Sequence, residues 1–486
     1  MKINLSRLSI LRGFALFELL ISIIALVISL WTQSEIGRTA LFGYSWTRLF
    51  IAGLFLAATA GSAWLSIIVW RRSGSEKIVR GIEKLLARSN LRLALWIFLL
   101  LIFTSSTLLV YLLYLTRGTP YTHFYQRLTP LALWLALSTL AACIALTLWR
   151  GEIPRLRLQT IAWVMLILIA GISVYFSLWQ RKSAIFQDVF FMHREGNRLL
   201  ELKNPYARVL KGDMVQNEKY ATLFPLSYEL SAVVQSLGLH DFTLWLQFWQ
   251  IVFLISYLGL ALLIFYIPYQ ASLTALALFG AFFMLFNRWS LELITIHDID
   301  FIPILLLVGS LALLPKHRGL SFLLFGASLA FKQIAIFLLP VYLIWAWQLG
   351  DRRLSWKFAL DLLWIAIIPA LTSLPFLAWN WEGFVKSVLF SATRRSYAPN
   401  DVLSLDALMG WAGLPGKLPM LALMLLIYIF AWTKKLKPFT AGLLTLATFV
   451  AFNSVLFESY LVWLMPFIPL AAYEVSVSIS SRSNSE

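Results

Sequence analysis

Apolar runs long enough to cross a lipid bilayer recur along the whole 486-residue chain. A spanning helix needs about 20 apolar residues, because the hydrocarbon core is about 30 Å thick and each helical residue rises about 1.5 Å. The predicted spans are 13–31, 49–70, 93–115, 130–149, 159–179, 244–266, 271–287, 299–315, 320–331, 334–348, 358–379, 419–432, 439–457 and 460–479. We therefore expect an all-α polytopic membrane protein with about 13–14 transmembrane helices.

The composition agrees with this class. Hydrophobic residues make up 60% of the chain and charged residues 13%, about half the charged share of a soluble domain. The net charge of +17 would suggest nucleic-acid binding in a soluble protein, but here the basic residues lie mainly between apolar runs. Membrane orientation and anionic lipid headgroups explain that placement, so we expect membrane lipid and no nucleic acid as partners. The single cysteine, Cys143, excludes a zinc or redox site built from several cysteines.

The distribution of lysine and arginine predicts the orientation, because short loops rich in these residues face the cytoplasm. With a cytoplasmic N-terminus, the inside segments carry 22 of the 40 basic residues, the short outside segments six and two long outside loops twelve. This scheme requires that the apolar run 223–239 does not cross. We expect that run to form a helix on the outer face, within the first long extracytoplasmic loop, 180–243. The second such loop is 380–418.

With this topology, residues able to do acid–base or phosphate chemistry converge on the outer face from four segments. They are Asp188, His193 and Arg194 in the first long loop, His297 and Asp298 in a short turn, Lys332 and Gln333 between two short helices, and Arg394, Arg395 and Tyr397 in the second long loop. Asp300 begins the next predicted span, so we expect it to cap that helix.

Several of these residues lie in motifs that resemble those of a known family. Asp188-Val-Phe-Phe, followed by Gly196, Leu199-Leu200 and Asn204-Pro205-Tyr206, resembles the pattern D-F-x-x-Y…A-x-x-L-L-x-G-x-N-P-Y. Segments 220–228, 330–333 and 460–466 resemble later elements of the same series. The series is typical of the GT-C superfamily of polyprenyl-phosphate-sugar-dependent glycosyltransferases, especially the mannosyltransferase-like family 87.

The resemblance implies a GT-C-like catalytic membrane core over 158–486, preceded by a four-span extension over 1–157. Two positions depart from the family pattern. Met192 stands where the pattern has tyrosine, and Asp188 stands alone where a pair of acidic residues is expected. The missing acid leaves dependence on a divalent metal open, and we expect no other cofactor.

The resemblance also implies a reaction, in which a hexose, expected to be mannose, moves with inversion from a polyprenyl-phosphate carrier to a glycan or lipid acceptor. Asp188 is the expected general base, which accepts the proton of the attacking hydroxyl. The expected ligands of the departing phosphate are Lys332, Arg394 and Arg395. The other expected substrate contacts are Gln333, Tyr397, His193, Arg194, Asn204, Tyr206, His297 and Asp298.

Two other functions remain open at this point. A transporter or flippase for lipid-linked glycans predicts ionisable residues near mid-span and helices broken at the bilayer centre, whereas the polar residues here gather at one surface. A non-enzymatic scaffold of an envelope assembly complex is the third. For the leading interpretation we expect a bacterial cytoplasmic (inner) membrane protein with its site outside the cytoplasm.

Overall fold

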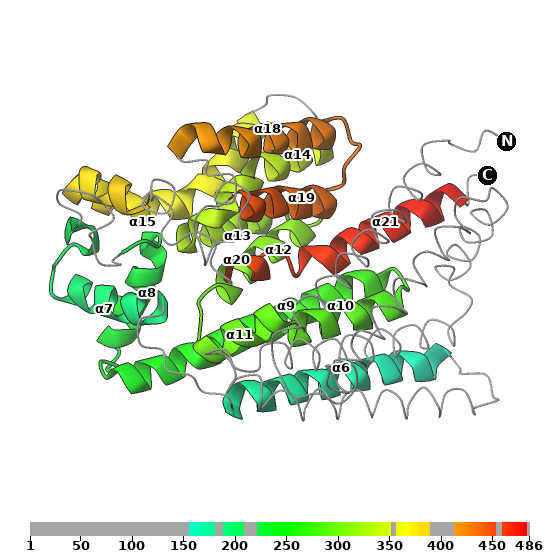
Figure 1. The fold of residues 1–486 in the computed structure, drawn as a ribbon, viewed down its shortest axis with the longest axis horizontal. Helices are drawn as coiled ribbons and strands as arrows, with labels where there is room; N and C mark the ends of the chain where they lie inside the picture. The colour runs from blue at the N-terminus through cyan, green and yellow to red at the C-terminus, as the bar shows by residue number, and fades with distance from the viewer. Residues whose placement is uncertain are drawn as a thin grey trace, which may run out of the picture. The chain divides into compact units, whose positions relative to one another are not determined.

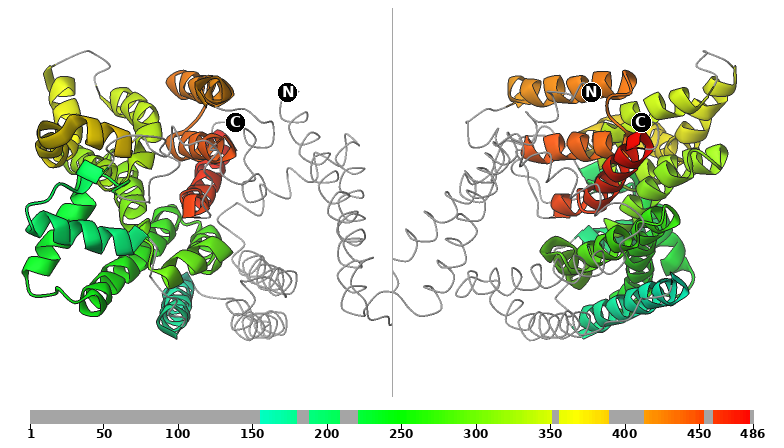
Figure 2. Two further views of the ribbon diagram at one scale, coloured as in Figure 1. Left: turned by 60° about the vertical axis from the view of Figure 1, so that its left-hand side comes forward. Right: turned by 90° about the vertical axis from the view of Figure 1, so that its right-hand side faces the viewer.

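The computed structural model describes residues 155–179, 188–208, 221–350, 356–388, 413–452 and 459–483. Throughout these residues the regular structure is helical and contains no strand, as Figure 1 and Figure 2 show. The described residues between 155 and 478 belong to one compact unit. The four predicted N-terminal spans, and with them nearly all of the expected extension 1–157, lie outside the described residues.

The described helices follow one another with mostly short connections. They are α6 (Arg155–Trp179), α7 (Asp188–Leu200), η1 (Pro205–Arg208), α8 (Pro225–Ser236), α9 (Phe242–Gln270), α10 (Thr274–Phe286), α11 (Arg288–Ile296), α12 (Phe301–Leu313), α13 (Arg318–Phe331), η2 (Gln333–Leu338), α14 (Leu339–Leu349), α15 (Trp356–Val388), α18 (Gly413–Trp432), α19 (Pro438–Ala451), α20 (Ser459–Val462) and α21 (Phe467–Ser483). The elements η1 and η2 are short 3-10 helices.

Three described segments are long and apolar enough to cross a membrane: Phe242–Gln270, Leu360–Val388 and Tyr460–Val477. Leu276–Phe286 and Trp289–Ile296, which are bent by 49° relative to each other, would together form a fourth. The other apolar helices among the described residues have 10–17 residues each. These lengths support a membrane-embedded helical protein, while the expected number of crossings stays a prediction.

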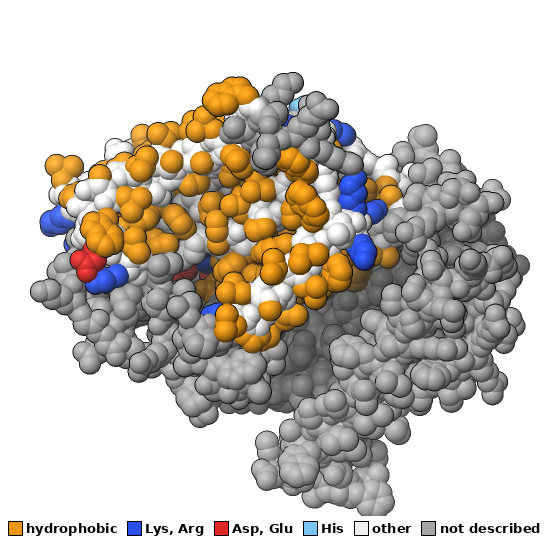
Figure 3. Space-filling view, turned by 90° about the horizontal axis from the view of Figure 1, so that it is seen from above, with side chains coloured by type: hydrophobic (Ala, Val, Ile, Leu, Met, Phe, Trp, Pro, Cys, Tyr) orange, Lys and Arg blue, Asp and Glu red, His pale blue; other side chains and the backbone are white. Residues whose placement is uncertain are grey.

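The exposed surfaces also fit a lipid environment. One side of α9 is buried and carries Trp245, Trp249, Phe253, Tyr257, Leu260 and Ile264. Its other side exposes Leu244, Phe248, Ile251, Ile255 and Leu262. Hydrophobic side chains also cover the face seen in Figure 3, over α15 and α18, with lysine and arginine side chains toward its ends. Contiguous apolar surface of this kind is unfavourable in water and favourable against lipid tails.

Two hydrogen bonds hold α12 and α13 side by side. The Ser321 hydroxyl donates to the Ser310 carbonyl at 2.6 Å, and the Ser328 hydroxyl donates to the Pro303 carbonyl at 2.7 Å. Such serine contacts satisfy polar groups between closely packed helices where no water is present. They fix the register of α12 against α13, and thus the residues at the start of α12 relative to those at the end of α13.

The helix α8 agrees with the expectation that the run 223–239 forms a helix that does not cross the membrane. Its twelve residues span about 18 Å, which is too short to cross a bilayer, and it packs against α7. The helix α15 differs from its predicted range, 358–379, because it continues past a kink at Asn380 to Val388. The Asn380 side chain accepts a hydrogen bond from the Gly383 amide at 2.9 Å, which restarts the helix as an N-cap does. The first part of the predicted loop 380–418 is therefore helical.

Candidate functional site

Three segments that lie far apart in the chain meet at Lys332. Its ammonium nitrogen lies 2.5 Å from an Asp300 carboxylate oxygen and 3.6 Å from an Asp188 carboxylate oxygen. Asp300 and Lys332 are buried, whereas the Asp188 side chain is 18% exposed. Asp188 is thus the member of this charged cluster that a substrate can reach most easily.

A break in helical structure places Lys332 at this point. The helix α13 ends at Phe331, and Lys332 itself has an extended backbone (φ −148°, ψ 133°) before η2 begins. A lysine buried among apolar helices needs a counter-ion, because an uncompensated charge costs several kcal/mol there. Asp300, at the start of the neighbouring helix α12, supplies that counter-ion, and the α12–α13 register keeps the two within reach.

The turn before α12 adds a second carboxylate. His297 ends α11 in the left-handed backbone region (φ 59°), which reverses the chain. Asp298 follows, and its carboxylate accepts a long hydrogen bond of 3.4 Å from the Asp300 amide. The side-chain amide of Gln250 lies 3.0 Å from the His297 ring, which ties this turn to α9.

The cluster carries more negative than positive charge. Lys332 interacts electrostatically with three carboxylates, those of Asp188, Asp298 and Asp300, and with the Tyr460 hydroxyl. The Tyr460 ring centroid lies 5.8 Å from the Lys332 nitrogen, and Tyr460 is part of α20. Three carboxylates against one ammonium among the described residues make this position attractive to a hydroxyl or a cation and unfavourable for an anion.

The helix α7 presents Asp188 because α8 and α9 hold it in place. Gly196 allows α7 to approach α8 closely, since an added Cβ would lie 2.4 Å from the Ser231 hydroxyl. The Gln235 side chain donates to the His193 carbonyl at 2.9 Å. The His193 ring lies 3.1 Å from the His240 carbonyl and packs edge-on against Trp245, and its burial lowers the pKa of the imidazole.

The Asn204-Pro205-Tyr206 motif anchors the loop after α7 to α15. The Asn204 side chain accepts a hydrogen bond from the Tyr206 amide at 2.9 Å, and the Tyr206 hydroxyl donates to the Leu223 carbonyl at 2.8 Å. The Tyr206 ring packs edge-on against Phe384, with centroids 4.9 Å apart. Burial raises the pKa of the Tyr206 hydroxyl well above its ordinary value. Both motif side chains are therefore occupied in holding the loop.

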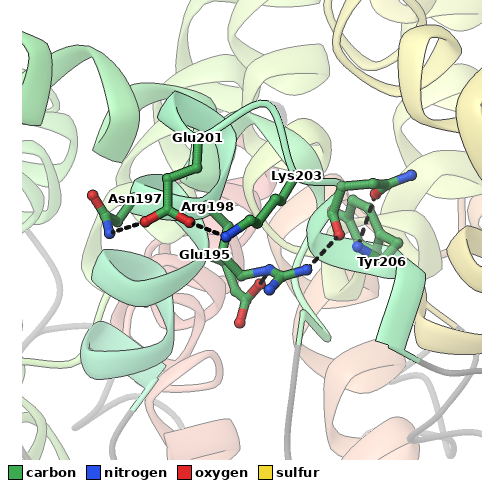
Figure 4. Close-up of polar contacts among 7 residues, drawn as sticks. Glu195, Asn197, Arg198, Glu201, Lys203 and Tyr206 are labelled. Atoms are coloured by element: carbon green, nitrogen blue, oxygen red, sulfur yellow. Dashed lines mark hydrogen bonds and ion pairs between the residues drawn. The ribbon is translucent and has the colours of Figure 1, made fainter.

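Polar contacts connect the last turn of α7 to the residues that follow it, as Figure 4 shows. The buried Glu195 carboxylate lies 3.3 Å from the Arg198 guanidinium, which also donates to the Asn204 carbonyl at 3.3 Å. On the exposed side, Glu201 forms an ion pair with Lys203 at 2.7 Å. The buried contacts join α7 to the Asn204 turn, so that a displacement of one should also displace the other.

No family model and no curated protein matches this chain. The motif resemblance and the geometry described above are therefore the grounds for assigning a function.

The structure brings part of the predicted site together. Asp188, Asp298 and Lys332 share one cluster, and His297 adjoins it. Gln333 instead donates to the Thr222 carbonyl at 3.1 Å, and Arg194 is exposed on α7. Asn204, Tyr206 and His193 hold the loop as described. The remaining predicted residues, Arg394, Arg395 and Tyr397, lie outside the described residues.

Sequence reasoning missed two members of the cluster. Asp300 was expected to cap α12, but its side chain makes no capping hydrogen bond and binds Lys332 instead. Tyr460 was noted only as part of a motif, yet its ring lies beside the lysine. The available signal for Asp300 was Lys332 itself, because a lysine between apolar helices requires an acidic partner.

Proposed function

We propose that this chain is a membrane glycosyltransferase that moves a hexose from a polyprenyl-phosphate carrier to a hydroxyl group of a glycan or lipid acceptor. Mannose is the first sugar to test. The observation that supports this most directly is the approach of Asp188, in the family-like motif, to within 3.6 Å of Lys332, in a second family-like motif. Two motif residues from distant segments thus share one charged cluster beside apolar helices.

The proposed reaction follows from the chemistry of a reachable carboxylate. Asp188 accepts the proton of the acceptor hydroxyl while the hydroxyl oxygen bonds to the anomeric carbon of the sugar. The bond between that carbon and the phosphate oxygen breaks on the opposite face, and its electron pair leaves with the lipid phosphate. The product has inverted configuration, and the carboxylate returns to its charged form when the proton passes to water. A general base of this kind contributes about 10²–10⁴-fold to the rate.

The phosphate needs cations at a different place from Lys332. Lys332 already faces three carboxylates, so a phosphate beside it would meet net negative charge. We assign phosphate binding to Arg394 and Arg395 in the loop 380–418, because arginine binds phosphate oxygens in a bidentate manner. The apolar surface of the membrane-embedded helices would accommodate the lipid chain of the donor.

Transport of a lipid-linked glycan is the second candidate. The helix break at Lys332 and the buried Lys332–Asp300 pair are features that transporters place at their substrate sites. Reconstitution into liposomes separates the two functions. A transferase produces a new glycosidic bond on one face, whereas a transporter moves intact substrate between the two faces.

The decisive experiment incubates purified protein with radiolabelled polyprenyl-phosphate mannose or glucose and a mixture of glycan and lipid acceptors. We expect a new labelled product from the wild type, and a decrease of about 10²–10⁴-fold in Asp188→Asn. The matched control is Asp241→Asn, since Asp241 also begins a helix and asparagine caps as well as aspartate. Full transfer by a folded Asp188→Asn protein would refute the assigned base.

A further inference from the structure

The carboxylates of Asp300 and Asp188 lie at unequal distances from the Lys332 ammonium group, and the difference indicates which of them holds the lysine. The ammonium nitrogen of Lys332 forms a close ion pair with Asp300 at 2.5 Å, whereas its 3.6 Å distance from Asp188 exceeds the range of a hydrogen bond. Hydrogen bonding is lost over this interval, but Coulomb attraction falls only as the inverse of distance. At 3.6 Å the lysine retains about three quarters of the attraction that it would exert at 2.8 Å.

We infer that Asp300 is a positioning residue, which holds Lys332 back from Asp188 so that the lysine supports the charge of Asp188 without forming a hydrogen bond to it. A direct bond would occupy a carboxylate lone pair and make Asp188 a weaker proton acceptor. This inference deepens the proposed function and rests on it for its catalytic meaning. The electrostatic relationship between the three side chains can be tested without any turnover.

The positions of the three side chains in the fold support the inference that Asp300, and not Asp188, holds Lys332. Asp300 and Lys332 are buried directly before α12 and directly after α13, two helices that the Ser328–Pro303 hydrogen bond holds in register. Asp188 is the first residue of α7, and its side chain is partly exposed. Asp300, before α12, therefore fixes the position of the Lys332 ammonium group. Substrate can approach the cluster from the more exposed carboxylate, Asp188.

The other charged and titratable groups around the pair are few among the described residues. Lys332 is also faced by Asp298 and by the Tyr460 hydroxyl, and Asp188 is also faced by Tyr228 and Tyr460. None of these supplies a second positive charge. Asp300 and Asp188 also repel each other directly, so Lys332 is the cation through which any further influence of Asp300 on Asp188 passes. The position between Lys332 and Asp188 suits a neutral acceptor hydroxyl.

The test measures how readily Asp188 gains a proton. Only the protonated carboxyl group reacts with a water-soluble carbodiimide and an amine, so mass spectrometry of the Asp188 peptide across a pH series gives a labelling midpoint. In the purified full-length protein, Asp300→Asn should move this midpoint down by about one pH unit, because Lys332 then binds Asp188 directly. Lys332→Met should move it up by at least as much.

Two further variants control the measurement. Asp361→Asn removes the acidic partner of Arg318, the first residue of the helix that Lys332 follows, and it should leave the Asp188 midpoint unchanged. The double variant Asp300→Asn with Lys332→Met removes both charges of the buried pair, so it is expected to fold even if Asp300→Asn alone does not. Its midpoint should lie within one pH unit of that of Lys332→Met, the remaining difference being the direct repulsion between Asp300 and Asp188.

A midpoint that stays constant or rises in Asp300→Asn overturns the inference. So does a double variant whose midpoint differs from that of Lys332→Met by a full pH unit or more, because Asp300 would then act on Asp188 mainly by direct repulsion and not through Lys332. In the transfer assay we expect Asp300→Asn to lower kcat at least ten-fold, with the acceptor KM within about two-fold and the acid limb of the pH profile at lower pH. If the wild type transfers no sugar, the proposed function fails while the labelling result stands. If it transfers sugar and the midpoint does not move, this inference alone fails.

Discussion

Arg318 binds Asp361 through two hydrogen bonds to the same carboxylate oxygen, from Nε at 2.8 Å and from Nη2 at 2.6 Å. Arg318 is the first residue of α13, and Lys332 follows the last residue of that helix. The pair joins α13 to the early part of α15, which also approaches closely at Gly326. One end of α13 is thus fixed by an ion pair to α15, and the other by an ion pair to Asp300.

The first prediction concerns the stability of this junction. Asp361→Asn leaves the Arg318 guanidinium partly buried without its anion, so it should lower the free energy of unfolding by about 1–3 kcal/mol, less than for a fully buried pair. Thermal unfolding in detergent measures this change. The matched control is Glu382→Gln, which breaks the exposed Lys386–Glu382 pair on the same helix and should have little effect. Equal losses in both variants would contradict the role given to burial.

The second prediction concerns Gly196. An added methyl group would lie 2.4 Å from the Ser231 hydroxyl, so Gly196→Ala should push α7 away from α8. Overpacking of this kind costs about 1–3 kcal/mol, and displacement of α7 should also decrease sugar transfer because Asp188 begins that helix. Ser231→Gly in the same protein removes the closest contact and should restore part of the lost sugar transfer, while stability recovers less because glycine inside α8 costs about 1 kcal/mol. Gly171→Ala in α6 is the control, since no neighbour lies within 4 Å of its added Cβ.

Much of the fold was predictable from hydrophobic periodicity and charge distribution. The apolar runs correspond to helices wherever the chain is described, and the run 223–239 forms a short helix beside α7 as the topology required. The approach of Asp188 to Lys332 follows from the same reasoning, because both were placed on the outer face. The positions of the helices and the expected side of each loop depend on the local composition of the chain, which can be read directly from the sequence.

The remaining features depend on packing between distant segments. Asp300 could cap its own helix or reach a neighbour, and the choice is made by the register of α12 against α13 through Ser328 and Pro303. Tyr206 was expected to contact substrate, but it is buried because the loop after α7 packs on Phe384 beyond the kink of α15. The motifs that contain Asp188 and Tyr206 do not indicate the register of α12 against α13 or the kink in α15.

The third prediction separates the hydrogen bond of Tyr206 from its packing. Tyr206→Phe removes the donor to the Leu223 carbonyl and retains the ring, so it should cost about 1–3 kcal/mol because a buried acceptor is left unpaired. Tyr206→Ala also removes the contacts with Phe384 and Tyr228 and should cost about 3–5 kcal/mol. Chemical unfolding followed by tryptophan fluorescence distinguishes the two. A larger loss in the phenylalanine variant would show that packing is not the main contribution.

The fourth prediction is a pH dependence of stability that arises at Glu229 in α8. Burial raises the pKa of this carboxyl group to about 7. Because the folded state holds the proton more tightly than the unfolded chain, the contribution of Glu229 to stability is complete below its ordinary pKa and is lost as the pH rises through about 7. After allowance for partial solvent exposure, the loss between pH 5 and pH 8 should be about 1–2 kcal/mol.

Glu229→Gln removes this titration, so the variant should be more stable than the wild type at pH 8 and similar to it at pH 5. Thermal unfolding of both proteins at a series of pH values tests the sign directly. Glu201→Gln serves as the control, because Glu201 is exposed and its ion pair with Lys203 lowers the pKa of its carboxyl group. That control should show no extra pH dependence between pH 5 and pH 8. If the difference between wild type and Glu229→Gln is constant over this range, the carboxyl group of Glu229 does not titrate near neutral pH.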